Sequence, residues 1–413
     1  MSYRDDLNAI YQAALQSVEG RHSVVAALRD YDTSSPVHVV AIGKAACSMY
    51  AGAHDVLSEQ ISRALVITKE GHVDPALSRA RVRFIESGHP WPTQASLDAG
   101  ASLLKFIKTV PHDGRLLFLI SGGASSLVEV LPQGVSLAQL YEVNDWLLGS
   151  GFDIHTMNRV RKAISTVKGG RLASYLAGRE TLVLLISDVP GDAPATIGSG
   201  LLVADSHCDA KPLSDLLAEL PEWMTALIND NDLNAQASGE VFDTISVDVI
   251  ASLADAKHAA AQCAQSLGYD VYEHAAHLGG DAVVVGRKLA SELLNGPAGV
   301  HVWGGETSVC LPEKPGRGGR NQHLALAAAI ELDGCLGAAL LVAGTDGTDG
   351  PTDDAGALVD GQTVGRAATR GFDPRACLSA CDSGSLFEAS GDLICTGPTG
   401  TNVMDLMIGL KMC

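Results

Sequence analysis

Short apolar runs recur through the first half of the chain, and segments with helical periodicity separate them. The runs are VHVVAIG, ALVIT, RLLFLIS and TLVLLIS, near residues 38, 64, 115 and 181. Continuous apolar strands that alternate with helices are typical of a parallel sheet covered on both faces. The pattern therefore predicts an α/β fold built on a parallel sheet, with ligands expected at the carboxyl ends of the strands.

A polar stretch rich in Asn and Asp, residues 221–240, interrupts this alternation. After it the strand-like runs YDVYEH, GVHVWGGE, ALLVAGTDG and DLICTGPTG alternate with the helix-like runs DAVVVGRKLASELL and NQHLALAAAIEL. A loss of periodicity followed by a fresh series of elements indicates a domain boundary. We predict an N-terminal domain over residues 1–235 and a C-terminal α/β domain over residues 236–413.

The composition limits the classes of binding partner and the cellular compartment that we expect for this protein. The 413 residues are 46% hydrophobic, and 29 Lys and Arg stand against 48 Asp and Glu, so the net charge of −19 argues against nucleic acid and anionic membranes. No apolar run reaches the ~18 residues of a membrane span, and the first residues lack the pattern of a signal peptide. Cys47, Cys310 and Cys395 lie in apolar or strand-like runs, which predicts buried, reduced thiols and a cytoplasmic protein.

Two glycine turns follow strands of the first half. ISGGASS supplies Ser121, Gly122, Gly123 and Ser125, whose amides and hydroxyls suit a phosphate. It matches neither the Walker loop nor G-x-G-x-x-G, and a plain tight turn explains it equally well when it is taken alone. Lys44, in AIGKAA, can neutralise a phosphate or carboxylate, although a lysine with its head in solvent is the commoner outcome.

The segment NRVRKAISTVKGGRLA predicts a helix that ends at Gly169 and Gly170. Its apolar positions share one face, and Arg161 and Lys162 lie on the opposite face. Such a basic face is a candidate wall for an anionic ligand, but more often it is only solvated.

Carboxylates cluster in two further loops. SDVPGD contains Asp188 and Asp192, and AGTDGTDGPTDDAG contains Asp346 and Asp349. Mg²⁺ favours one or two carboxylates together with phosphate oxygens and water, whereas Asp-Gly turns also arise without any function. The two clusters together favour a site for a nucleotide and a metal ion.

The loop GRGGRNQ places Gly319, Arg320 and Asn321 at the start of a predicted helix, after a strand that ends near Glu306. Guanidinium groups match phosphate and carboxylate oxygens two at a time, and a helix N-terminus favours an anion. We therefore predict an anion site at this helix start.

These stretches together resemble the glycerate 2-kinase family of the MOFRL type. The matching motifs are AIGKAA, SGHPWP, LISGGASSL, MNRVRKAISTVKGGRLA, SDVPGD, WGGETSV, GRGGRNQ, AGTDGTDGPTDDAGA and TGPTGTNVMDL, in family order from about residue 10 to about residue 410. The resemblance implies a Rossmann-like N-terminal domain, a C-terminal α/β domain and an active site in the cleft between them. It also implies phosphorylation of D-glycerate by ATP and Mg²⁺ to give 2-phosphoglycerate, with a homodimer as a candidate assembly.

Carried over by motif, the family's lysine and arginine fall on Lys44 and Arg320, and with Asp188 they form the expected catalytic set. Phosphoryl transfer depends on positioning and charge neutralisation, which these cations can supply. Asp188, Asp192 and Asp349 are alternatives for binding Mg²⁺ or for taking the proton of the glycerate 2-hydroxyl. The expected metal ligands are Asp192, Asp346 and Asp349. The expected substrate and phosphate contacts are Ser121, Gly122, Gly123, Ser125, Arg161, Lys162, Glu306, Gly319 and Asn321.

Three departures from the family pattern stand out. His323 occupies the position of a usual Glu in GGRNQE, Asp281 replaces a Glu, and GSGLLVAD replaces a commoner SGPT run. Two alternatives to the kinase remain: a hydroxypyruvate reductase, for which the dinucleotide fingerprint is missing, and a nucleotide or sugar-acid sensor that has lost turnover, toward which only His323 points.

Overall fold

The computed structural model describes residues 2–32, 35–204, 213–229 and 239–412. The chain forms two compact units: a C-terminal unit of residues 1–23, 188–190 and 251–413, and an N-terminal unit of residues 24–187 and 191–250. The predicted boundary between residues 235 and 236 lies outside the described residues. The structure also groups residues 1–23 with the C-terminal unit, which the sequence pattern gave no reason to expect.

The N-terminal unit is built on a six-stranded sheet in the order β3-β2-β1-β4-β5-β6. The neighbouring pairs β3–β2, β2–β1, β1–β4 and β4–β5 are parallel, which confirms the predicted parallel sheet. This order is that of the Rossmann fold. The strands are β1 (Val37–Ile42), β2 (Ile61–Lys69), β3 (Val82–Ser87), β4 (Arg115–Ile120), β5 (Thr181–Ile186) and β6 (Ile245–Ala251). The sequence pattern missed β3 and β6, whose residues alternate between half-buried and exposed.

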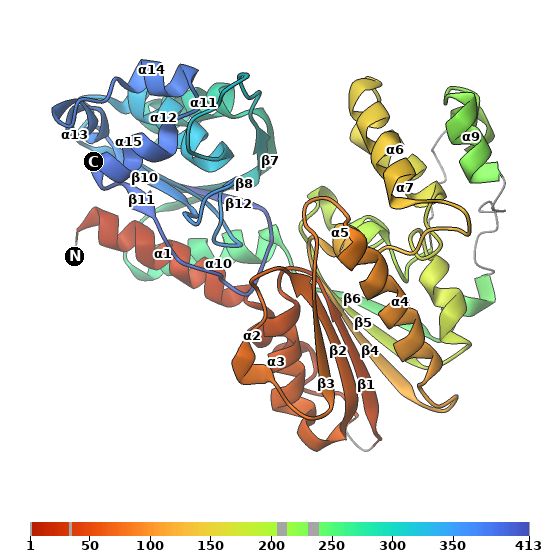
Figure 1. Ribbon diagram of the computed structural model, residues 1–413. Coiled ribbons are helices and arrows are strands. Elements are labelled where there is room, and N and C mark those ends of the chain that lie inside the picture. Colours follow the sequence, from red (N-terminus) through yellow and green to blue (C-terminus); the bar gives the residue numbers. More distant parts are fainter. Residues whose placement is uncertain (1, 33–34, 205–212, 230–238, 413) are drawn as a thin grey trace. The chain divides into compact units, whose positions relative to one another are not determined.

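Helices cover both faces of this sheet (Figure 1). The chain runs from β1 through α3 (Ala46–Leu57) to β2 in one direction, and from β3 through α4 (Gln94–Lys108) to β4 in the other. Because parallel crossovers are right-handed, this reversal puts α3 and α4 on opposite faces. It also makes the gap between β1 and β4 the switch point, where ligands of such sheets bind. The helices α2 (Gly20–Ala27) and α5 (Ala124–Leu127) lie near this sheet.

A smaller helical cluster completes the N-terminal unit. It comprises α6 (Leu137–Gly149), α7 (Ile154–Ala163), α8 (Leu213–Leu217) and α9 (Glu222–Asn229), around buried side chains such as Leu140, Val160 and Met224. α9 lies inside the polar stretch that we expected to be a boundary.

The predicted helix of NRVRKAISTVKGGRLA is shorter than expected, because α7 ends at Ala163. Ser165 and Thr166 bond instead to Glu129 and Val130, which draws the chain away from the helix axis. The glycines that follow have positive φ and precede a 3-10 turn instead of capping α7. The 3-10 turns are η1 (Ser58–Gln60), η2 (Pro75–Leu77), η3 (Arg171–Leu176), η4 (Pro190–Asp192), η5 (Ile197–Ser199) and η6 (Gly239–Phe242).

The C-terminal unit contains a mixed sheet in the order β11-β10-β9-β12-β8-β7. β12 is antiparallel to both of its neighbours, β8 and β9, whereas β7 and β8 are parallel. β10 is antiparallel to β9 and to β11. The strands are β7 (Val271–Asp281), β8 (Gly299–Ser308), β9 (Ala338–Gly344), β10 (Gly356–Asp360), β11 (Leu393–Ile394) and β12 (Asp405–Lys411). The sequence pattern missed β10 and β12.

Two helical layers enclose this sheet (Figure 1). α1 (Tyr3–Ser17) and α10 (Leu253–Ser266) pack together on one face, and α11 (Ala282–Asn295) and α12 (Arg320–Leu332) pack together on the other. α1 is the amphipathic helix predicted at the start of the chain, and Ser2 and Asp5 cap it reciprocally. The principal core lies between the sheet and α11 and α12, around Trp303 and Leu324. The remaining helices are α13 (Thr363–Thr369), α14 (Pro374–Ser379) and α15 (Ser383–Ser390).

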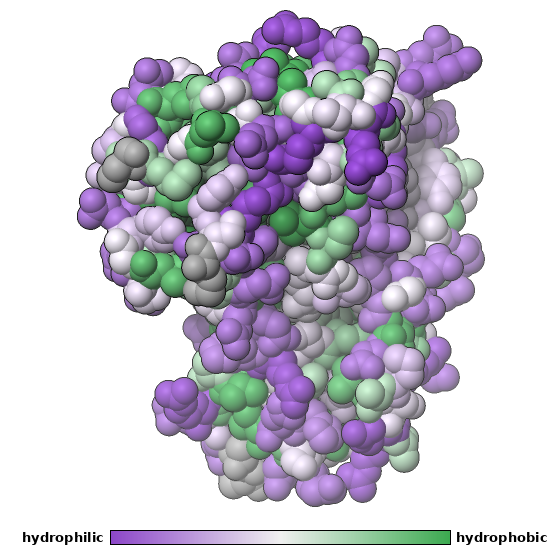
Figure 2. All heavy atoms as spheres, turned by 90° about the vertical axis from the view of Figure 1, so that its left-hand side faces the viewer, coloured by the Kyte–Doolittle hydropathy of each residue, from purple (hydrophilic) through white to green (hydrophobic). Residues whose placement is uncertain are grey.

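The described cysteines are all free thiols, but their burial differs from the prediction. Cys47 is buried as expected, whereas Cys310 and Cys395 are exposed because each lies just beyond the end of a strand. The face shown in Figure 2 is mostly hydrophilic, with small hydrophobic groups between the polar residues. Among the described residues, no helix is long and apolar enough to span a bilayer.

Candidate functional site

Two interlocked turns lie at the switch point of the N-terminal sheet. The Lys44 amide donates to the Gly122 carbonyl at 2.9 Å, and the Ala45 amide donates to Ser121 Oγ at 3.1 Å. The turns approach so closely that a Cβ atom on Gly43 would lie 2.1 Å from Ser121 Oγ. Ser121 is fully buried, so its hydroxyl holds the turns together instead of facing a ligand.

The next two residues of this turn present open amides. In the part of the chain that the structure describes, the N–H groups of Gly122 and Gly123 donate to no protein acceptor. Gly123 adopts φ +84° directly before α5, and the Lys44 side chain passes beside it, with Cγ 3.4 Å from the position of a Cβ on Gly123. Gly122 is buried and Gly123 is half-buried, and amides removed from water require a partner, so these two amides beside a lysine are suited to an anion.

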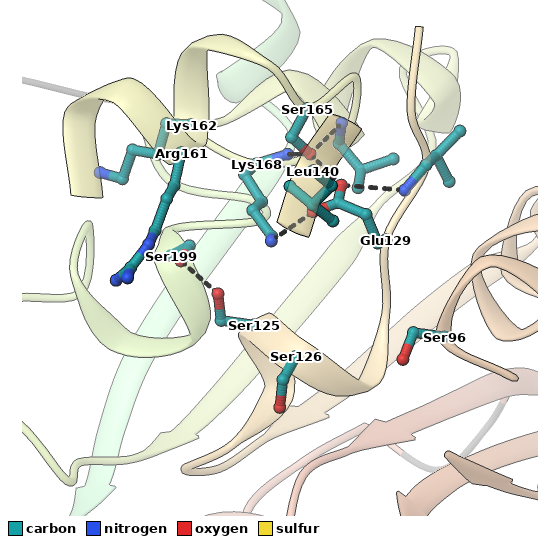
Figure 3. A network of polar contacts seen from close by, with 12 residues as sticks. Ser96, Ser125, Ser126, Glu129, Leu140, Arg161, Lys162, Ser165, Lys168 and Ser199 are labelled. Atoms are coloured by element: carbon teal, nitrogen blue, oxygen red, sulfur yellow. Dashed lines mark hydrogen bonds and ion pairs between the residues drawn. The ribbon is translucent and has the colours of Figure 1, made fainter. Parts of the chain in front are cut away.

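A cavity of about 330 Å³ opens beside this turn. It contains three charged side chains, and two of them neutralise each other: Lys168 Nζ and Glu129 Oε2 are 2.5 Å apart, and both groups are buried (Figure 3). Ser165 Oγ donates to Glu129 Oε1 at 2.6 Å and completes the pair. The lining residues are His89, Pro90, Trp91, Pro92, Gly123, Ser125, Ser126, Glu129, Leu140, Asn144, Arg161 and Lys168.

Arg161 is the third charged group of the cavity. Its Nε donates to Asn144 Oδ1 at 2.8 Å and its Nη1 to Asn158 Oδ1 at 3.1 Å, and both acceptors are neutral amides. Among the described residues it makes no ion pair, and burial lowers the pKa of its guanidinium group. A guanidinium group without a counter-charge in a cavity is a receptor for a carboxylate or phosphate.

Lys162 does not join Arg161 in this cavity. Its side chain points elsewhere (Figure 3), is buried, and donates from Nζ to the Ala195 carbonyl at 3.0 Å. The predicted basic face is therefore divided: Arg161 faces the cavity, whereas Lys162 bonds to the backbone. Ser125 does line the cavity, and its Oγ is 2.7 Å from Ser199 Oγ.

In the C-terminal unit, Arg320 is the first residue of α12 and is held by two carboxylates. Its Nε and Nη2 donate to Asp405 at 2.7 and 3.1 Å, and its Nη1 lies 2.6 Å from Glu306 Oε1. Burial by itself lowers the pKa of the Arg320 guanidinium group. The negative charges of Asp405 and Glu306 have the larger effect, so the pKa is raised. Asp405 is almost fully buried at the start of β12, and sequence reasoning missed it although it stands within the motif TGPTGTNVMDL.

The helix start beside Arg320 is occupied by a carboxylate of the protein itself. Asp349 accepts hydrogen bonds from the amides of Asn321 and Gln322 at 3.0 and 2.8 Å, and a Cβ on Gly319 would lie 2.3 Å from Asp349. Burial raises the pKa of Asp349 to about 7, although both hydrogen bonds act in the opposite direction. Asp349 therefore takes two of the amides at this helix start, and the anion site that we expect there stays a prediction.

The aspartates predicted to bind a metal ion or a proton differ in their hydrogen-bond partners and backbone conformation. Asp346 accepts from the amide and the hydroxyl of Thr348 within its own turn, both at 3.0 Å. Asn402 donates to Asp188 at 3.4 Å, and Asp192 has φ +52° in the turn after β5. In the described part of the chain, no group of three or more His, Cys, Asp or Glu is arranged to hold a metal ion.

The departure at His323 lies in the interior of the C-terminal unit. His323 is buried in α12, with Nδ1 3.4 Å from Ser383 Oγ. Burial lowers the pKa of the imidazole, and the negative charge of Asp281 acts against this shift. The two substituted positions of the family pattern therefore influence each other electrostatically.

These features define the class of the protein. It is an α/β protein of Rossmann strand order, with a glycine turn beside a lysine at its switch point and, in a second unit, an arginine bound by two carboxylates. Residues 6–224 match the family described as Domain of unknown function (DUF4147), and residues 299–405 match the MOFRL family. The chain belongs to the MOFRL-type glycerate 2-kinase family.

Individual relatives support this membership. The chain is 38% identical to a D-glycerate 2-kinase of Thermotoga maritima, over 91% of this chain and 90% of that one. It is 35% identical to a glycerate 2-kinase of Pyrococcus horikoshii, over 97% and 93%. An Agrobacterium vitis protein, 39% identical over 89% and 97%, is provisionally named a hydroxypyruvate reductase. The crystal structure of a Thermotoga maritima glycerate kinase superposes with a TM-score of 0.86 at 34% identity, covering 98% and 99% of the two chains.

Proposed function

We propose that this protein transfers the γ-phosphate of ATP to the 2-hydroxyl group of D-glycerate, giving 2-phosphoglycerate and ADP. The observation that carries the proposal is the turn with the open amides of Gly122 and Gly123 beside Lys44, at the switch point of a Rossmann sheet. Such a turn stabilises the charge of a phosphoryl group, and charge stabilisation is the principal requirement of this reaction. Full-length relatives with glycerate 2-kinase names support the choice of substrate.

In this mechanism the Gly122 and Gly123 amides and the Lys44 ammonium group bind the transferred phosphoryl group. Arg320 supplies a further positive charge from the C-terminal unit. Asp405 fixes two of its nitrogens, so the guanidinium group loses little freedom when a phosphate binds. Glu306 is about half exposed, so it can exchange its contact with Arg320 for a substrate oxygen.

The cavity beside the glycine turn suits the glycerate carboxylate. Arg161 donates to that carboxylate while Asn144 and Asn158 hold the guanidinium group from behind, and Ser125 contributes a hydroxyl. A volume of about 330 Å³ accommodates a three-carbon acid together with water. The neutral partners of Arg161 leave its charge available, whereas Lys168 is already neutralised by Glu129.

Mg²⁺ enters with the nucleotide in this proposal. Asp192 and Asp346 would hold the ion through their carboxylates, and the ion would supply positive charge to the phosphates of the nucleotide. Asp349 contributes indirectly, by capping α12 and fixing the backbone next to Arg320. Asp188 accepts the proton of the glycerate 2-hydroxyl as the bond to phosphorus forms.

One assay tests the reaction. Purified protein with D-glycerate, ATP and Mg²⁺ is expected to release ADP and 2-phosphoglycerate, identified by separating the two phosphoglycerate isomers. A parallel incubation with NADH and hydroxypyruvate tests the reductase suggested by the Agrobacterium name. NADH oxidation without ADP release contradicts the proposal, and nucleotide binding without turnover in either assay indicates a sensor.

We further propose a cytoplasmic location and a homodimer. Free thiols among the described cysteines agree with a reducing compartment. Light scattering of the eluted protein measures the assembly, and a monomeric mass contradicts the dimer.

A further inference from the structure

A second cavity, of about 550 Å³, lies at the amino ends of β2 and β3. The Lys44 turn follows the carboxyl end of β1. Because β1 and β2 are parallel, this cavity lies at the opposite ends of the strands of the same sheet. Its lining includes Arg63 of β2, Arg81 and Arg83 at the start of β3, and Lys105 and Phe106 of α4. The volume falls within the ordinary range for small-molecule sites.

The charge of this cavity is opposite to that of the whole chain. Four of its twelve lining residues are Arg or Lys and none is Asp or Glu, although acidic residues outnumber basic ones by 48 to 29 overall. Within the described residues, the side chains of these four cations make neither an ion pair nor a hydrogen bond. Their donors therefore remain available to a ligand.

Two observations show that the cationic groups are organised. The guanidinium carbon of Arg63 lies 5.1 Å from the centroid of the Phe106 ring, which fixes this arginine over the cavity wall. Behind Phe106 lies the buried His38, whose ring meets Phe106 edge to face at 6.3 Å. Burial lowers the pKa of His38, and the positive charges of Arg63 and Arg179 lower it further.

Protection of the sheet edge does not explain this cluster. Charged residues on an edge strand discourage pairing with other chains, which accounts for Arg83 on β3. Arg63, however, lies on β2 inside the sheet, and Lys105 comes from a helix. Four cations from three elements around one hollow indicate a ligand site instead.

We propose that this cavity binds a small molecule carrying at least two phosphate or carboxylate groups, separate from the site of phosphoryl transfer. Guanidinium forks bind such groups two oxygens at a time, and a compact anion satisfies several cations at once. A net charge of −19 disfavours long anionic polymers and membranes, which would also contact the surrounding acidic surface. The proposal does not depend on which reaction the protein catalyses.

Calorimetry of the full chain with pyrophosphate, tripolyphosphate and citrate, without metal, tests the binding. The wild type is expected to bind one more equivalent of polyphosphate or citrate than Arg63→Ala/Arg83→Ala, or to bind at least about tenfold more tightly at that site. Citrate binding without polyphosphate binding assigns the site to carboxylates, and the reverse result assigns it to phosphates. The matched control is Arg79→Ala, because Arg79 lies in the same segment and its side chain, among the described residues, bonds only to the Ala76 and Ser78 carbonyls. Equal binding by wild type and double variant, or equal loss in Arg79→Ala, overturns the proposal.

His38 provides a second readout that does not depend on activity. An anion beside Arg63 favours the charged imidazole, so the pKa of His38 is expected to rise when pyrophosphate binds. NMR titration of the histidine rings measures this, with His38→Gln to identify the signal and Lys105→Ala as a variant that leaves Arg63 in place. An unchanged His38 titration, or tighter binding of an oligonucleotide or of anionic vesicles than of the small anions, contradicts the proposal.

Discussion

Two glycine-rich turns in this protein each precede a helix, and at one of them a carboxylate of the protein itself accepts from the first amides of the helix. Among the described residues, the Gly122 and Gly123 amides of the N-terminal unit have no acceptor, whereas the Asn321 and Gln322 amides of the C-terminal unit donate to Asp349. Both turns precede a helix and both suggest an anion site. The difference lies in a carboxylate 28 residues farther along the chain, which supplies the anion of the second turn from within the protein. A glycine turn is therefore a ligand site only when the fold leaves its amides unpaired.

The largest expected effect is the loss of activity when Lys44 or Arg320 is replaced, and it distinguishes a catalytic from a structural role. Lys44→Ala and Arg320→Ala are each expected to lower kcat/KM by at least ~10²-fold, the loss that follows removal of a preorganised charge contact. Steady-state kinetics with ATP and D-glycerate measure it, and Lys108→Ala on the exposed side of α4 is the control. An Arg320→Ala protein with near-normal kcat/KM but a lower unfolding temperature makes Arg320 a structural partner of Asp405 alone.

Removal of the Asp349 carboxylate tests its role at the start of α12. Asp349→Ala leaves two buried amides without acceptors, so the free energy of unfolding is expected to fall by roughly 2 kcal/mol. Urea denaturation of the variant and the wild type measures the change. Unchanged stability together with lost magnesium dependence would instead place Asp349 among the metal ligands.

A variant of Arg161, in the cavity beside the Gly122–Gly123 turn, tests the proposed contact with the glycerate carboxylate. Arg161→Ala is expected to raise KM for D-glycerate at least about tenfold, because a charge-assisted contact to the carboxylate is lost. Its unfolding temperature is expected to change little, since the partners of Arg161 are neutral amides. The control is Arg159→Ala, which removes the same charge from α7. An equal rise of KM in both variants assigns the effect to general charge.

The last prediction concerns pH. Asp349 has a folded pKa of about 7 against an ordinary value of 3.8, so between these limits the folded state binds more protons than the unfolded state. Its contribution to stability is present in full below about pH 4 and is lost as the pH rises through about 7. The difference in stability between wild type and Asp349→Ala is therefore expected to shrink from pH 4 to pH 7, as measured by denaturation at several pH values. A difference that grows over this range contradicts the raised pKa.

The sequence predicted the elements whose chemistry is local. Apolar strands such as β1 and β4 and helices such as α11 and α12 carry their periodicity in consecutive residues, and the order of the motifs predicted the family. The edge strand β3 was missed because, of its residues, only Ser87 is buried, so it carries no continuous apolar run.

The roles of individual polar residues were harder to predict, because partners distant in sequence decide them. Ser121 Oγ accepts from the Ala45 amide, and Lys162 Nζ donates to the Ala195 carbonyl, and neither partner could be read from the motif. Asp405 escaped notice because its significance depends on Arg320, 85 residues earlier. Gly122, Gly123 and Arg161 remain predictions that the geometry supports, since their donors lack a charged partner among the described residues.

The placement of β12 has a consequence for how the chain is assembled. This strand lies between β8 and β9 and is antiparallel to both, so the C-terminal sheet stays divided until residues 405–411 have been synthesised. α1 packs against α10 and β12, so its contacts are complete only after residues 405–411 have been made. The N-terminal unit, in contrast, has all its strands once residue 251 has emerged, so on the ribosome it can fold while the opening helix is still without its partners.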